Sequence, residues 1–167
     1  ELFIEASDFQ ENPEKGFYRL QPGGEVRLRH AYFIRCDDVI HNEAGDVVEL
    51  RCTYDAATRG GTAPDGRKVK GTIHWVSATQ AVDAVVRLYD RLYTAEFPGR
   101  ATGNFLDDLN PESVTVLSGC KVEPSVLGDD ADTRYQFERN GYFWRDHCDS
   151  SKERLVFNRI IALRDSW

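Results

Sequence analysis

The stretch 25–34 constrains the fold most, because its polar and apolar residues alternate with a period of two. Val26 and Leu28 fall on one side of the pattern, and Arg27 and Arg29 fall on the other. A β-strand sends alternate side chains to opposite faces, so one face can join a core while the other carries two arginines aimed the same way. Arginine is a planar, permanently charged fork that pairs with phosphate or with a base edge. A half-buried strand with a solvated charged face gives the same local pattern, so the rest of the chain has to decide.

The remainder of the chain consists of short β-forming stretches separated by turn signals. The sequence predicts strands at 47–54, 69–76, 85–93, 114–117, 120–123 after an interruption at Gly119, 134–139, 142–146 and 155–164. The strand that begins at 25 is expected to run to about 36. Asn140-Gly141, between two alternating stretches, indicates a tight hairpin turn. Short helices are expected after Ser77 and at 104–109. Without a βαβ rhythm or a glycine-rich phosphate loop, the pattern favours a mostly β protein with barrel-like strand spacing.

Composition excludes several classes of protein. The 167 residues are enough for one domain or two small ones, and 41% hydrophobic residues indicate a folded chain. No apolar run reaches the roughly 18 residues of a membrane span, and no secretion signal is recognised, so we expect no membrane partner and a cytoplasmic protein. The chain starts at Glu1 and contains no methionine. We therefore expect it to be a piece of a longer chain.

The cysteines do not have the spacing of a metal site. None of the four forms a C-x-x-C pair, and none has a histidine at ligand spacing. We expect free thiols in a reducing compartment and no zinc; the four are Cys36, Cys52, Cys120 and Cys148.

The net charge of −7 argues against a protein whose whole surface wraps nucleic acid. It still allows a local basic patch. Arginine greatly outnumbers lysine, which suits planar recognition of phosphates and bases, although a composition bias of the source genome explains the excess equally well.

Six collinear stretches carry a family resemblance. They read EVRLRHAY at 25–32, GRKVKGTIHWVS at 66–77, RLYDRL at 87–92, NPES at 110–113, YQFERNGYF at 135–143 and FNR at 157–159. Together they closely resemble the C-terminal anticodon-binding region of the glutaminyl-tRNA synthetases. The resemblance spans essentially the whole chain.

The resemblance implies a fold of two linked antiparallel β-barrels with short helices, like the barrels of ribosomal 5S-RNA-binding proteins. The distal barrel would comprise residues 17–85, and the proximal barrel residues 1–16 and 86–167, short of its first strands. The family's catalytic domain is absent from this chain. The resemblance therefore implies no catalytic residue, cofactor or metal here, with ATP and magnesium belonging to a full-length, monomeric enzyme. The implied partner is the anticodon loop of the tRNA for glutamine.

The resemblance also assigns roles to individual residues. Arg19 falls where the family contacts the third anticodon base, Arg29 where it contacts the first, and Arg27 where it holds nearby backbone phosphate. Gln136 and Arg139 fall where it reads the central uracil. The chemistry is consistent, because splayed loop bases are stacked and read on their exposed edges, and glutamine offers both a donor and an acceptor.

Two departures affect these roles. The family often carries basic or amide side chains where this sequence has Gly16 and Tyr18, so Tyr18 is expected to stack on the third base instead. A further arginine of the family that helps to read the central base would lie before Glu1. We therefore expect the isolated chain to bind RNA weakly.

Three rival interpretations remain open on sequence alone. A glutamyl-type synthetase would share the architecture, but the residues around Gln136 and the stretch 71–77 favour the glutaminyl type. A free-standing RNA-binding barrel would be complete and basic. A protein–protein module would leave RNA binding unchanged when Arg29 and Gln136 are replaced.

Overall fold

The computed structural model describes residues 1–163, which are mostly β-structure in three sheets without an α-helix. The chain divides into two compact units, Glu1–Thr79 and Gln80–Trp167. Among the described residues, no helix has the length and apolar character needed to cross a membrane.

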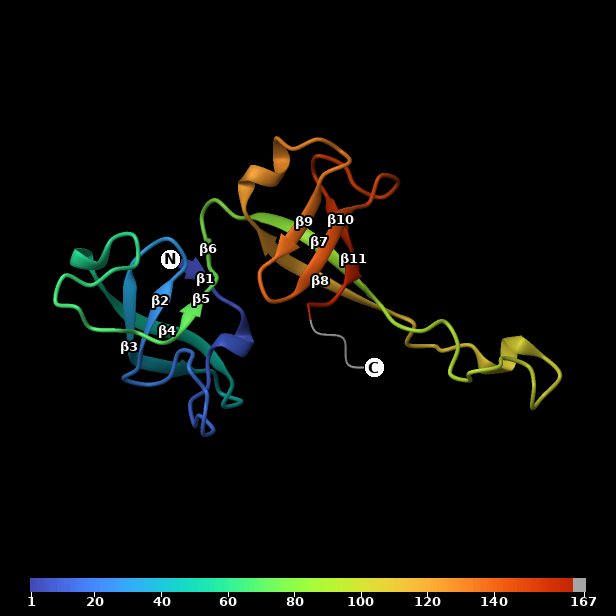
Figure 1. Cartoon of the computed structure of the whole chain (residues 1–167), viewed down its shortest axis with the longest axis horizontal. Helices are drawn as coiled ribbons and strands as arrows, with labels where there is room; N and C mark the ends of the chain where they lie inside the picture. The colour runs from blue at the N-terminus through green and yellow to red at the C-terminus, as the bar shows by residue number, and fades with distance from the viewer. Residues whose placement is uncertain (164–167) are drawn as a thin grey trace. The chain divides into compact units, whose positions relative to one another are not determined.

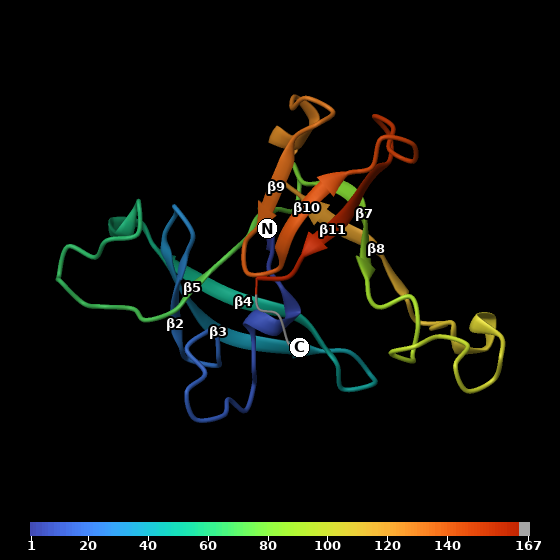
Figure 2. The ribbon, with the colours of Figure 1, turned by 45° about the vertical axis from the view of Figure 1, so that its right-hand side comes forward.

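The first unit contains a four-stranded sheet and a two-stranded ladder (Figure 1). Its elements are β1 (Leu2–Phe3), η1 (Ala6–Asp8), β2 (Glu25–Leu28), β3 (Phe33–His41), β4 (Val47–Asp55), η2 (Ala56–Thr58), β5 (Thr72–Ile73) and β6 (Val76–Ser77). The larger sheet has the order β4-β3-β2-β5, and β1 pairs with β6. Figure 2 shows β3 and β4 as two long neighbouring strands joined by a hairpin, at the loop 42–46 that the sequence predicts.

The alternation in β2 is confirmed by its burial. Val26 and Leu28 are buried, whereas Glu25 and Arg27 on the other face are only half-buried. The buried side of β2 packs in one cluster with Leu20, Ile34, Cys36 and Ile73. Burial of this apolar face fixes the register of the strand, because a shift by one residue would bring the charged face into the core.

The strand expected from 25 to 36 is wrong in one respect, because the chain turns back inside it. The N–H of Leu28 donates to the carbonyl of Tyr32 at 2.9 Å, and the N–H of Ala31 donates to the carbonyl of Leu28 at 3.0 Å. His30 takes a φ of 57° at the tip. The two halves of the predicted strand are therefore the two arms of a hairpin, β2 and β3, and Arg29 lies in the turn.

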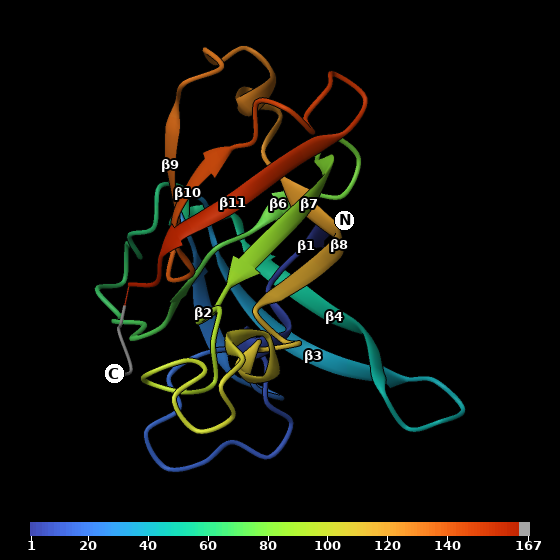
Figure 3. The same ribbon diagram turned by 90° about the vertical axis from the view of Figure 1, so that its right-hand side faces the viewer.

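The second unit is one five-stranded sheet with the order β8-β7-β11-β10-β9. Its elements are β7 (Val82–Tyr89), η3 (Phe105–Asp108), β8 (Val114–Val122), η4 (Pro124–Leu127), β9 (Arg134–Phe137), β10 (Gly141–Arg145) and β11 (Leu155–Ile161). Figure 3 shows β7, β11 and β10 in succession across this sheet. The predicted last strand extended to Arg164, which lies outside the described residues.

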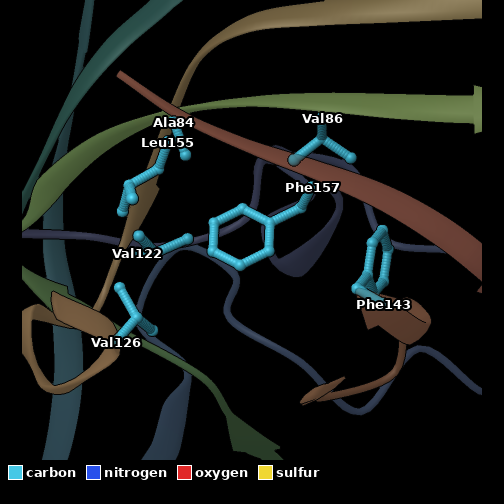
Figure 4. Packing of buried hydrophobic residues seen from close by; sticks show 7 residues of the cluster. All are labelled: Ala84, Val86, Val122, Val126, Phe143, Leu155 and Phe157. Carbon is cyan, nitrogen blue, oxygen red and sulfur yellow. The ribbon is translucent and has the colours of Figure 1, made fainter. Parts of the chain in front are cut away.

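One face of this sheet is closed by a compact apolar cluster (Figure 4). Phe157 is fully buried at its centre, and the ring of Phe143 points toward it from β10. Tyr135 and Phe137 of β9 pack against the same cluster. Tyr135, Phe137 and Phe143 therefore face the core, and the residues that alternate with them on β9 and β10 face away from it.

An extended arm continues the ladder of β7 and β8 beyond the sheet (Figure 1). The N–H of Asp90 donates to the carbonyl of Ser113 and the N–H of Asn110 to that of Leu92, both at 2.9 Å. The short helix predicted at 104–109 is present at the end of this arm as the 3-10 turn η3, capped by the Asn104 side chain, which accepts the N–H of Leu106.

The expected pair of antiparallel barrels is only partly confirmed. The chain is mostly β, but no closed barrel forms among residues 1–163. Two ladders are parallel, β2 with β5 and β11 with β7. Parallel pairing arises where the connection between two strands is long enough to return the chain to the same end, as residues 29–71 and 90–154 do.

The contacts of the first 16 residues differ from the expected assignment to the second barrel. These residues group with the first unit, because Leu2 pairs with Ser77 and the N–H of Gln10 donates to the carbonyl of Leu20 at 3.1 Å. The division into distal and proximal barrels stays a prediction. The helix expected after Ser77 is also wrong, since Ser77 ends β6 and β7 starts at Val82.

A substitution at Gly71 would test the close packing of the first unit. A Cβ at Gly71 would lie 1.9 Å from the carbonyl oxygen of Tyr18, whereas a Cβ at Gly128 would have its nearest atom at 3.8 Å. We expect Gly71→Ala to lower the free energy of unfolding by about 2 kcal/mol or more, because backbone must move to admit the methyl group. Urea denaturation measures this, with Gly128→Ala as the nearly neutral control. Equal stability of the two variants would contradict the packing described.

Candidate nucleic-acid interface

Arg67 organises the polar face of β2. Its guanidinium contacts Glu25 Oε1 at 3.1 Å, Asp55 Oδ2 at 2.5 Å and Asp65 Oδ2 at 2.7 Å. These carboxylates belong to β2, to the end of β4 and to the loop that contains Arg67. The hydrogen bond from Arg67 lowers the pKa of Asp55, and the backbone N–H and side chain of Arg67 together lower the pKa of Asp65. One arginine therefore fastens the loop to two strands.

Arg27 lies under this loop rather than in open solvent. Its guanidinium carbon and that of Arg67 are each 5.4 Å from the centre of the Phe33 ring. Phe33 is buried, and its N–H donates to Oγ1 of the buried Thr58 at 2.8 Å. Arg27 is half-buried, and its Nε is buried without a hydrogen-bond partner. Its stem is thus fixed by the strand and the aromatic ring.

Arg29 is exposed at the start of the β2–β3 turn. Its N–H donates to the carbonyl of Ile73 at 3.0 Å, and its own carbonyl accepts the indole N–H of Trp75 at 3.0 Å. Both main-chain groups of Arg29 are therefore held by the 73–75 segment. The side chain is presented from a fixed backbone, which is what a base-contacting arginine needs.

Arg19 is positioned by an internal carboxylate. Its Nη1 donates to the carbonyl of Ser7 at 2.9 Å and lies 3.3 Å from Oδ1 of Asp8, whose side chain is fully buried. Since a guanidinium has five N–H donors, these contacts leave several donors for another partner.

Tyr18, next to Arg19, is 58% exposed, so its ring is available for stacking. The ammonium of Lys70 lies 4.8 Å from the centre of that ring. Sequence reasoning had missed Lys70. The available signal was its place inside the 66–77 stretch, but the contact joins residues 52 positions apart, at the point where Gly71 packs against the carbonyl of Tyr18.

Gln136 and Arg139 lie on one hairpin in the second unit. Gln136 is exposed on β9, opposite Tyr142 of β10. Arg139 lies at the tip with a φ of 65°. The expected two-residue Asn140-Gly141 turn is replaced by a three-residue loop, since Gly141 pairs directly with Phe137. A Cβ at Gly141 would lie 2.3 Å from the carbonyl of Ile161, so this glycine is required by close approach to β11.

The structure therefore distributes the predicted residues over two units. Arg19, Tyr18, Arg27 and Arg29 belong to the first unit, and Gln136 with Arg139 belongs to the second. Within residues 1–163, no three histidine, cysteine, aspartate or glutamate side chains gather as they would to hold a metal ion.

Comparison with known proteins gives two family matches. Residues 1–55 and residues 72–146 each match a family described as the anticodon-binding domain of class I tRNA synthetases (E and Q). The chain is 62% identical over 167 residues to a glutamine–tRNA ligase of Nitrobacter winogradskyi and 61% identical to one of Nitrobacter hamburgensis. A glutamine–tRNA ligase of Neisseria gonorrhoeae is 54% identical over 172 aligned residues, which include 99% of this chain. The chain spans 29% to 30% of the length of these relatives.

Acid titration tests the role of Arg67. The pKa values of Asp55 and Asp65 are lower in the folded chain than in the unfolded chain, where the pKa of an aspartate is about 3.9. Their ion pairs therefore stabilise the fold above that unfolded pKa. This stabilisation is lost as the pH falls through the lower pKa values of the folded chain. We expect Arg67→Gln to lower the urea midpoint at neutral pH, with the gap to the unsubstituted chain narrowing below about pH 4. Arg51→Gln, which removes an exposed pair with Glu49, is the control and should have little effect. A gap that is independent of pH would show that these ion pairs do not stabilise the loop.

Proposed function

Because the chain belongs to the anticodon-binding domains of the class I (E and Q) tRNA synthetases, we propose that it binds the anticodon loop of the tRNA for glutamine. It would do so as a region of a glutamine–tRNA ligase, the name its relatives carry. The ligase would attach glutamine to its tRNA elsewhere in a longer protein. Sequence identity of 61% to 62% over the whole of this chain is the observation that carries the proposal.

In this proposal the first unit contacts the outer anticodon positions. Arg29 meets the first base from its fixed turn, Arg27 supports phosphate, and Arg19 meets the third base with Tyr18 stacked beside it. The exposure of Arg29 and Tyr18 and the internal bracing of Arg19 support these roles. Single-stranded loop bases are recognised by this combination of edge contacts, stacking and phosphate contacts.

The second unit would read the central uracil with Gln136 and Arg139. Uracil presents both donors and acceptors on its pairing edge, and a glutamine amide supplies the complementary set. The exposure of Gln136 on the outer side of β9 supports this role. We further propose that the two units correspond in outline to a distal barrel, expected at residues 17–85, and a proximal barrel, expected at residues 1–16 and 86–167.

The chemistry of aminoacyl transfer is not assigned to this chain. We propose that ATP and magnesium act in the catalytic part of the longer ligase, which we expect to be monomeric and cytoplasmic. The free thiols of Cys36 and Cys52, on directly opposite positions of β3 and β4, suit a reducing compartment.

A glutamyl-type synthetase is the second candidate, because the family description covers both types. The names of the relatives favour the glutamine type. The two candidates differ in the anticodon that the chain should prefer, which binding experiments can resolve.

Binding of an anticodon stem-loop tests the function. We expect the 167-residue chain at low salt to bind the loop with the glutamine anticodon at micromolar concentration, and more tightly than a loop whose central uracil is replaced by cytosine. Gln136→Ala and Arg139→Ala should remove the preference, whereas Arg29→Ala should weaken both complexes by about 10- to 150-fold, the range of a lost hydrogen bond to a charged group. Fluorescence anisotropy measures each dissociation constant.

The control variant is Arg51→Ala, an exposed arginine of β4 paired with Glu49. It should leave both dissociation constants unchanged. Equal binding of the two loops by the unsubstituted chain, or a glutamate-anticodon preference, would contradict the proposed function.

A further inference from the structure

The outer face of the β9–β10 hairpin carries two aromatic cross-strand pairs. Gln136 lies opposite Tyr142, and Arg134 lies opposite Trp144. These residues point away from the core, because Phe143 lies in the buried cluster and Tyr135 and Phe137 pack against it. Residues directly opposite on one face have Cβ atoms about 5 Å apart. The hairpin therefore presents two pairs of one polar and one aromatic side chain.

The Gln136–Tyr142 pair is open to solvent. Tyr142 is 43% exposed, and Gln136 is exposed beside it. An exposed ring offers a flat apolar surface, and an amide about 5 Å away offers a donor and an acceptor. A planar heterocycle lying on the ring would place its edge against the amide.

The Arg134–Trp144 pair is already occupied by protein groups. The Arg134 guanidinium lies 4.8 Å from the Trp144 ring centre, and Arg134 Nη1 contacts Asp132 Oδ1 at 2.9 Å. His147 stands edge-on to the Trp144 ring at 4.6 Å and lies 3.5 Å from Asp132. The charge of Arg134 is thus paired with Asp132, and the Trp144 ring is covered by Arg134 and His147. The Gln136–Tyr142 pair is therefore the place on this face for a ligand.

We propose that Tyr142 is a base-stacking residue and forms, with Gln136, a two-part subsite for one unpaired nucleobase. The ring of Tyr142 carries the base, and the amide of Gln136 reads its edge. This inference rests on the proposed function and adds to it a residue that neither the sequence motifs nor the family resemblance singled out.

The two halves of the subsite have different consequences for binding. Stacking is tolerant of sequence because every base has a π-face, whereas edge contacts distinguish one base from another. Tyr142 therefore contributes affinity for any base in the subsite, and Gln136 contributes the preference for uracil. A tyrosine that is merely a surface residue would contribute neither.

The test measures affinity and preference separately. The 167-residue chain and its variants are titrated with two anticodon stem-loops, one with central uracil and one with central cytosine. Tyr142→Ala should weaken both complexes by a similar factor, about 5- to 100-fold, the range measured for loss of a base–aromatic stack. Tyr142→Phe should bind like the unsubstituted chain, since the ring is kept. Gln136→Ala should reduce the ratio between the two loops while leaving the cytosine complex nearly unchanged.

Two further variants serve as controls, one for the loss of apolar bulk at position 142 and one for the loss of an exposed ring elsewhere. Tyr142→Leu keeps apolar bulk on the strand without an aromatic face and should lose affinity as Tyr142→Ala does, even where the alanine variant is less stable. Phe97→Ala removes an aromatic ring that is 56% exposed on the arm of the same unit and should change nothing.

The outcomes separate this inference from the function on which it rests. Lack of uracil preference in the unsubstituted chain contradicts the proposed function itself. If that preference is present but Tyr142→Ala or Tyr142→Leu binds both loops normally, the stacking role is wrong and the function stands. An equal loss in Tyr142→Phe would also overturn the stacking role, because it would assign the contact to the hydroxyl.

Discussion

The ion pairs of Arg67 with three carboxylates are the interaction on which the first unit depends. They close the loop after β4 over the polar face of β2, and Phe33 becomes buried beneath that loop. Arg27 is consequently held against an aromatic ring instead of projecting freely. A guanidinium that stacks on a ring keeps its charge and its N–H donors at the edge of its plane. This arrangement therefore fixes the position of Arg27 without neutralising it.

Local patterns predicted those parts of the fold that depend on neighbouring residues. The alternation in 25–28 identified the buried face, and the polar residues 42–46 identified the hairpin loop. Asn104 and the residues after it predicted a short helix, which the structure has as the 3-10 turn η3. In each case the deciding contacts lie within a few positions in sequence, so the pattern contains the necessary information.

The features that the sequence did not predict depend on distant contacts. The continuous strand fails at His30, where the turn is stabilised by pairing of the 73–75 segment with Arg29. The tight turn at Asn140 becomes a three-residue loop, and the glycine that follows it lies against the carbonyl of Ile161. Nothing in the neighbourhood of either residue encodes these partners, and the same is true of the carboxylate of Asp8 that braces Arg19.

The acidic net charge is compatible with RNA binding because many carboxylates are occupied inside each unit. Arg67 binds three of them, Arg87 contacts Asp146 and Asp149, and Arg19 contacts Asp8. These pairs orient side chains and loops, although their six carboxylates outnumber the three arginines. Recognition by edge contacts and stacking needs few phosphate contacts, and the salt dependence of binding follows the number of phosphates neutralised rather than the charge of the whole chain. An acidic protein can therefore read a short loop of RNA, provided that its arginines and aromatic rings are held in place from within.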